Sequence, residues 1–169
     1  MYTNKLVATV ISVFLLVVLA GCSGSGDPEL RFKEAQAKFE QGKYLDAAKG
    51  FDEVIKLAPK RADAHFFKGN ALSALGKKDE AIKEYDTAIA LAPDVFQPYY
   101  NKGNALAGLG RYEEAIACYD KTISMNPKHL KSYMNKSALL RTMGRNADAE
   151  SVLAKAKEAG AINGGAGQK

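Results

Sequence analysis

The sequence repeats one six-residue phrase four times: Gly42-Lys-Tyr-Leu-Asp-Ala47, Gly76-Lys-Lys-Asp-Glu-Ala81, Gly110-Arg-Tyr-Glu-Glu-Ala115 and Gly144-Arg-Asn-Ala-Asp-Ala149. Each copy has a glycine, a base, two variable positions, an acid and an alanine, and successive copies begin 34 residues apart. A fixed period of this length predicts a solenoid of stacked repeats. Such a solenoid is typical of an extended binding surface rather than of a catalytic pocket.

The phrase predicts a pair of antiparallel helices in each repeat. The glycine is expected at the turn, because it accepts the left-handed conformation that ends a helix. The acid falls in the first turn of the second helix, where the helix dipole favours it, and the small alanine lets the two helices pack closely. Gly69 and Gly103 are expected to do the same from the first helix, and Pro59, Pro93 and Pro127 recur where each second helix should end.

The repeat resembles the tetratricopeptide repeat, whose 34-residue pattern has conserved small, aromatic and proline positions. The two central repeats carry the resemblance on Gly69, Ala81, Tyr85, Ala88, Pro93, Tyr99, Gly103, Ala115, Tyr119 and Pro127. The resemblance implies an all-α fold, a right-handed solenoid of four helix-turn-helix units over residues 28–163. The units are predicted at 28–61, 62–95, 96–129 and 130–163, and the Gly-rich segment 164–169 is predicted to be a disordered tail.

The start of the chain differs from the repeats, and residues 1–21 are predicted to be a signal peptide that is removed. Its apolar stretch, 6–20, would extend only about 22 Å as a helix, short of the ~30 Å core of a bilayer. The sequence Leu19-Ala20-Gly21-Cys22 resembles the bacterial lipoprotein box, which implies cleavage before Cys22 and lipidation of its thiol. Residues 22–27 are then a flexible tether. An ordinary secretory signal with an incidental cysteine, or an uncleaved anchor, remains an alternative.

Lipidation at Cys22 implies an extracytoplasmic protein anchored to a membrane, either the outer membrane or the outer leaflet of the plasma membrane. The formal charge of +5 is spread along the chain, without the clusters of basic and aromatic residues that bind nucleic acid, so no nucleic-acid partner is predicted. His65 and His129 stand alone, and no phosphate loop, metal-ligand cluster or nucleophile motif occurs. We therefore expect no enzyme activity, no cofactor and no metal. Cys118 is expected to be a half-buried helix residue, with an intermolecular disulfide as the alternative.

In tetratricopeptide solenoids the first helices line a concave groove, and the resemblance places the fifth residue of each unit in it. These residues are Phe32, Phe66, Tyr100 and Met134, and the amides Asn70, Asn101, Asn104 and Asn135 lie close to them in sequence. Side-chain amides can both donate to and accept from a peptide backbone. Lys131, with Asn70 and Asn101, also matches a known carboxylate-binding pattern, but Phe66 and Asn135 replace two of its cations. These nine residues form the predicted partner-binding groove.

The resulting hypothesis is a membrane-anchored scaffold that binds a partner peptide or protein in its groove. Such a module would serve the assembly of envelope or surface complexes. Two alternatives remain: a structural homo-oligomer that associates through the same aromatic residues, and an adaptor for a cell-wall enzyme.

Overall fold

The computed structural model describes residues 26–162, which form eight helices and no strand. The helices are α2 (Pro28–Glu40), α3 (Tyr44–Leu57), α4 (Ala62–Ala74), α5 (Lys78–Leu91), α6 (Phe96–Ala107), α7 (Tyr112–Met125), α8 (Leu130–Thr142) and α9 (Asn146–Glu158). One antiparallel pair lies within each predicted unit, and the all-α solenoid predicted from the sequence is confirmed. The signal segment, Cys22 and the tail 164–169 lie outside the described residues.

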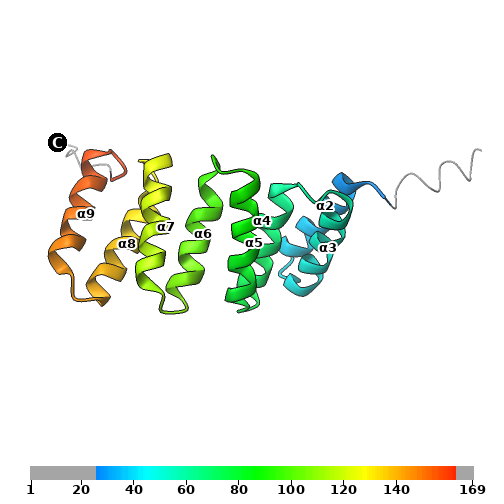
Figure 1. The fold of residues 1–169 in the computed structure, drawn as a ribbon, viewed down its shortest axis with the longest axis horizontal. Helices are drawn as coiled ribbons and strands as arrows, with labels where there is room; N and C mark the ends of the chain where they lie inside the picture. Colours follow the sequence, from blue (N-terminus) through cyan, green and yellow to red (C-terminus); the bar gives the residue numbers. More distant parts are fainter. Residues whose placement is uncertain (1–25, 163–169) are drawn as a thin grey trace, which may run out of the picture.

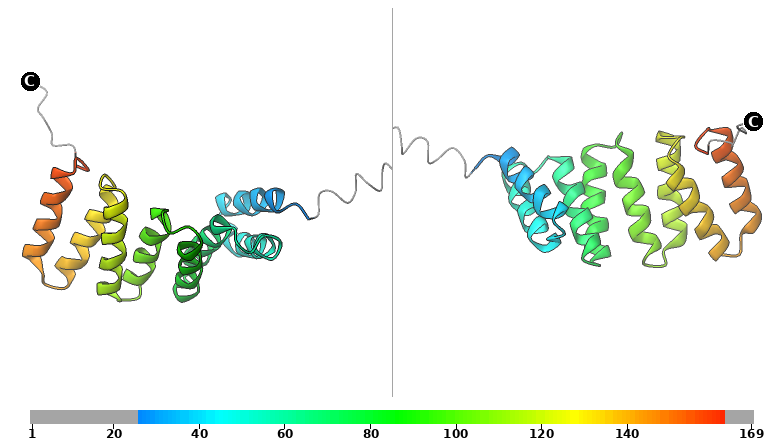
Figure 2. Two further views of the ribbon diagram at one scale, coloured as in Figure 1. Left: turned by 45° about the horizontal axis from the view of Figure 1, so that its top comes forward. Right: turned by 180° about the vertical axis from the view of Figure 1, so that it is seen from behind.

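The four helix pairs stand side by side in chain order and form an elongated body, with α2 at one end and α9 at the other (Figures 1 and 2). Each helix packs against the next, and the first helix α4 also contacts the first helices α2 and α6. Contact between successive first helices places them on the side where the units are closest. We call the side lined by α2, α4, α6 and α8 the inner face. No helix within residues 26–162 has the length and apolar character needed to span a membrane.

The glycine of each phrase forms the turn inside its pair, as predicted. Gly42, Gly76, Gly110 and Gly144 have φ of 75°, 79°, 77° and 77°. The residue that follows each glycine donates its backbone N–H to a carbonyl five residues earlier, for example Lys77 to Leu72 at 2.9 Å. This bond satisfies a carbonyl at the end of the first helix and fixes the direction of the second helix. The second helices end at Leu57, Leu91 and Met125, each two residues before a proline.

The other positions of the phrase also have a local role. In the last three copies the base pairs with the acid three residues later: Lys77 with Glu80 at 3.1 Å, Arg111 with Glu114 at 2.7 Å and Arg145 with Asp148 at 2.8 Å. These pairs are exposed and contribute little, on the order of a few tenths of a kcal/mol. The alanine matters more, because all four copies are fully buried where the paired helices meet.

In each of the two central pairs a tyrosine ring packs directly against the bare backbone of a glycine. A Cβ atom built on Gly69 would lie 2.6 Å from Cε1 of Tyr85, and one built on Gly103 would lie 2.7 Å from Cε1 of Tyr119. In the first unit the arrangement is exchanged: Ala35 occupies the glycine position, and Gly50 on the opposite helix makes room for it, with a Cβ-to-Cβ distance of 2.8 Å if Gly50 had a side chain. In each of these three helix pairs, the two helices can therefore pack this closely only because one of the two facing residues is a glycine.

Successive units are joined by a repeated ion pair that the sequence analysis did not predict. A lysine on each of α4, α6 and α8 reaches an aspartate on the second helix of the preceding unit: Lys68 to Asp52 at 2.6 Å, Lys102 to Asp86 at 2.5 Å and Lys136 to Asp120 at 2.5 Å. The three lysines are mostly buried and the aspartates about half exposed. The lysine stems thus pack in the junction while their ammonium groups fix its register.

Replacing Gly103 by valine is expected to destabilise the protein, because the new side chain must displace the ring of Tyr119. We expect a loss of about 1–3 kcal/mol of unfolding free energy, measured by thermal and urea unfolding. Gly26→Ala is the matched control, since a Cβ atom there meets nothing within 4 Å. An unchanged midpoint for Gly103→Val would contradict the close contact.

Candidate partner-binding face

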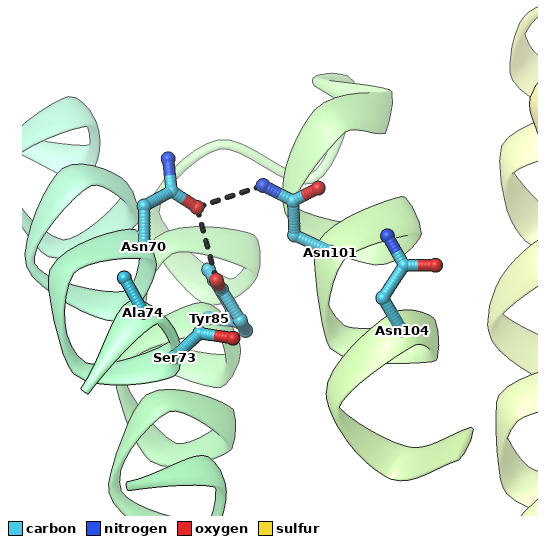
Figure 3. A pocket seen from close by; sticks show the side chains of 6 residues that line it. All are labelled: Asn70, Ser73, Ala74, Tyr85, Asn101 and Asn104. Atoms are coloured by element: carbon cyan, nitrogen blue, oxygen red, sulfur yellow. Dashed lines mark hydrogen bonds between the residues drawn. The ribbon is translucent and has the colours of Figure 1, made fainter. Parts of the chain in front are cut away.

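Two side-chain amides and one tyrosine meet on the inner face between α4 and α6. The hydroxyl of Tyr85 donates to Oδ1 of Asn70 at 2.9 Å, and Nδ2 of Asn101 donates to the same oxygen at 2.7 Å (Figure 3). One carbonyl oxygen therefore joins a second helix, its own first helix and the first helix of the next unit.

The same arrangement recurs one unit later. The hydroxyl of Tyr119 donates to Oδ1 of Asn104 at 2.8 Å, and Nδ2 of Asn135 donates to that oxygen at 2.9 Å. Burial raises the pKa of Tyr119 to about 12 and also raises that of Tyr85. Both phenols therefore keep their protons near neutral pH and remain hydrogen-bond donors. A donating hydroxyl fixes which end of each asparagine amide faces inward.

The outward ends of these amides are not used by the described part of the chain. Each of these four asparagines has one amide atom without a hydrogen bond to the rest of residues 26–162: Nδ2 of Asn70, Oδ1 of Asn101, Nδ2 of Asn104 and Oδ1 of Asn135. Along the inner face these atoms alternate between donor and acceptor, as the groups of a peptide backbone do. A shallow pocket of about 290 Å³ lies at Asn70, Asn101 and Asn104, with Ser73, Ala74 and Tyr85 completing its lining (Figure 3).

One predicted groove residue requires correction. Phe32 is only 7% exposed and belongs to the core of the first unit, where its ring packs edge-on against Phe51 and Phe67 with both centroids 5.5 Å away. The guanidinium of Arg61 covers the remaining side of the ring at 4.1 Å from its centroid. Phe32 is buried because Phe51, Phe67 and the guanidinium of Arg61 surround its ring, so it offers no surface to a partner.

The other fifth-position residues have different surroundings. Phe66 is half-buried and packs edge-on against Phe67, with ring centroids 5.3 Å apart. Tyr100 is half-buried against His129, with ring centroids 4.7 Å apart, and its hydroxyl lies 3.3 Å from Nδ2 of Asn135. Met134 is the open member, 54% exposed on α8, and Lys131 is exposed one turn before it. The predicted apolar row is therefore interrupted rather than continuous.

The sequence analysis used Tyr85 and Tyr119 only to identify the repeat and missed their role in orienting the amides. The signal was present, because each tyrosine follows its asparagine by the same 15 residues. Inside a helix pair, that spacing brings the two side chains across the turn to one another. Because both asparagine and tyrosine recur with the 34-residue period, the sequence indicates that the contact between them is repeated in each central unit.

The histidines and the described cysteine pack against other side chains of the fold. His65 is buried, with Nδ1 2.8 Å from Oε2 of Glu84 and Nε2 3.3 Å from the carbonyl of Pro59. His129 packs against aromatic rings, and its burial lowers its pKa. Burial raises the pKa of the half-buried Cys118 thiol, which disfavours the reactive thiolate. Among the described residues, no group of His, Cys, Asp and Glu side chains is arranged to hold a metal ion.

Comparisons with known proteins agree with this fold. Two family models described as tetratricopeptide repeat match residues 32–95 and 97–129, together more than half of the chain. No curated protein sequence matches the chain.

Solved structures show the same architecture. A crystal structure of MamA is 26% identical with a TM-score of 0.77, covering 84% of this chain and 82% of that one. MamA from Desulfovibrio magneticus RS-1 is 25% identical with a TM-score of 0.75, covering 80% of this chain and 76% of that one. The OM64 TPR domain of Arabidopsis is 20% identical with a TM-score of 0.67, covering 68% of this chain and 95% of that one, and shows the fold alone.

Removing the side chain of Asn104 is expected to destabilise the fold, because it leaves the buried Tyr119 hydroxyl without its acceptor. We expect Asn104→Ala to cost about 1–3 kcal/mol of unfolding free energy. In a Tyr119→Phe background the same change should cost clearly less, which a double-mutant cycle by urea unfolding measures. Additive effects of the two substitutions would contradict the shared hydrogen bond.

Proposed function

Because this chain belongs to the tetratricopeptide repeat family, whose members mediate protein–protein interactions, we propose that it is a membrane-anchored scaffold. It binds an extended segment of a partner protein along its inner face. It performs no catalysis itself, as is typical of the family, and it brings its partner to the extracytoplasmic side of a membrane. The partners belong to the assembly of envelope or surface complexes.

The row of oriented asparagine amides carries this proposal. A partner backbone that lies along α4, α6 and α8 can accept from Asn70 and Asn104 and donate to Asn101 and Asn135. A hydrogen bond to a backbone group makes no demand on the partner's side chain, so it supplies affinity without selecting a sequence. Half-buried Tyr100 and exposed Met134 add apolar contact beside the amides.

The amides are also prepared for binding before a partner arrives. The tyrosine hydroxyls hold Asn70 and Asn104, and each of these holds the amide of the next unit at 2.7 Å or 2.9 Å. Less side-chain freedom is therefore lost on binding than for free asparagines, which favours affinity.

The anchoring part of the proposal rests on the sequence alone. A short apolar segment followed by Leu19-Ala20-Gly21-Cys22 is the arrangement that lipoprotein signal peptidases cleave. Two or more acyl chains at Cys22 give lasting attachment, whereas one chain gives only reversible binding. The residues that follow are Ser and Gly, whose flexibility would let the repeats turn freely above the bilayer.

A photoreactive amino acid at position 134 is expected to trap the partner in living cells. Met134 is suited to this experiment because it is 54% exposed on the inner face and its replacement disturbs no hydrogen bond. Mass spectrometry of the adduct identifies the partner. The matched control carries the same amino acid at Lys83, which is exposed on the second helix α5.

The double change Asn101→Ala with Asn135→Ala should abolish this adduct with only a small change in melting temperature. It removes the two outward acceptors but leaves Tyr85 and Tyr119 bonded to their own asparagines. Equal adducts from positions 134 and 83, or an adduct that survives the double change, would contradict binding along the amides. Adducts containing only this chain would favour the self-associating alternative.

Lipidation is tested separately. Cells fed a clickable palmitate analogue should label the wild-type chain, and Cys22→Ser should remove the label and release the protein into the soluble fraction. Cys118→Ser, at the half-buried cysteine of α7, is the control and should keep both label and membrane association. Equal labelling of wild type and Cys22→Ser would overturn the anchor.

A further inference from the structure

An apolar pocket of about 410 Å³ opens beside Phe66, at the junction of the second and third units. Its walls are Ala62, Phe66 and Phe67 of α4, Ala88 of α5, and Val95 with Pro98 at the start of α6. This volume lies within the ~300–1,000 Å³ range of ligand pockets. Its almost wholly apolar lining distinguishes it from the amide pocket.

The equivalent places at the other two junctions are filled by this chain's own side chains. At the first junction the guanidinium of Arg61 lies over Phe32. At the third junction the ring of His129 packs against Tyr100 and against Phe96, with centroids 4.7 Å and 5.2 Å apart. In each case the residue just before a first helix closes over the fifth-position aromatic of the preceding unit.

The second junction lacks this cover because two residues are small. Val95 stands 34 residues after Arg61 and 34 before His129, and its side chain makes no comparable closure, being 40% exposed. Ala62 stands 34 residues before Phe96, at the same first position of its helix. The opening of the pocket at this junction therefore follows from its own small residues, Ala62 and Val95.

The pocket adjoins the amide row. Phe66 precedes Asn70 by one turn of α4, and Gln97 on the pocket's rim precedes Asn101 by one turn of α6. The carboxylate on the rim, Asp63, is already held by Arg61 at 2.8 Å. A ligand group that enters this pocket thus meets apolar walls and no uncompensated charge. The part of the ligand that remains outside the pocket lies next to the outward amides.

We propose that this pocket receives one large apolar side chain, such as Leu, Met or Phe, of the bound partner segment and so sets the register of that segment on the amides. This inference rests on the proposed function. The occupant is a polypeptide rather than an acyl chain, because only a polypeptide also supplies the backbone groups that Asn70 and Asn101 are oriented to bind.

The test uses a phage-displayed library of random linear peptides, selected against the full chain. The filled variant is Ala62→Phe with Val95→His, which copies Phe96 and His129 of the next junction. The matched control is Ala90→Phe with Lys83→His, which makes the same additions at exposed positions of α5. Methyl NMR of Val95 in the wild-type chain gives a second readout that does not depend on the fold of any variant.

The proposal expects the enriched peptides to share one large apolar residue. Replacing that residue by alanine should weaken binding to the wild-type and control chains by about tenfold or more, and should remove the shift of the Val95 methyl resonances. The filled variant should bind the original and the alanine peptide equally weakly.

Two outcomes overturn the inference in different ways. Peptides that bind through the amides, lose affinity with Asn101→Ala, and bind the filled variant as tightly as the wild type would refute the pocket and leave the proposed function standing. If no peptide is enriched, or if palmitate shifts the Val95 methyl resonances where peptides do not, both the pocket assignment and binding of extended segments fail.

Discussion

In the two central units, the contact between a tyrosine ring and a bare glycine backbone determines both how closely the paired helices pack and where the tyrosine hydroxyl lies. Because Gly69 and Gly103 lack side chains, the rings of Tyr85 and Tyr119 pack directly against the facing helix, and their hydroxyls reach Asn70 and Asn104. The hydroxyls fix these two asparagines, which fix two more across the unit junctions. A packing contact in the core thereby determines which amide atoms the surface offers.

The end units show what happens where this contact is absent. In the first unit Ala35 and Gly50 exchange roles, and the aromatic Phe51 that follows carries no hydroxyl. In the last unit Ser137 satisfies its own hydroxyl with the carbonyl of Ala149 at 3.2 Å. Neither unit has a tyrosine to orient an amide on the inner face, so the oriented amides begin at α4 and end at α8. The two tyrosines that orient the amides thus come from the central pairs, and the last pair contributes only Asn135 of α8 to the row.

The fold could be predicted almost completely from the sequence, because its signals are local and repeated. Each signal acts on the few residues around it. These signals are the glycine with positive φ, the acid in the next turn and the proline after the second helix. The binding face was harder, since exposure depends on the neighbouring unit. Phe32 and Phe66 occupy the same position in their units, yet one is covered by Arg61 and the other is left open by Val95. Periodicity reveals what the units share, and only a comparison between units reveals where they differ.

The lysine–aspartate links between units have a mechanical consequence. Each link joins a first helix to the second helix of the preceding unit, so it fixes the register at one side of the junction and any rotation between the units would turn about that point. In a solenoid whose units touch only their neighbours, bending is the sum of small rotations about such points. The pocket beside Phe66 has walls from two units, so its width changes whenever that junction rotates. A side chain bound in this pocket would hold that junction at one angle and would thereby favour one curvature of the whole solenoid.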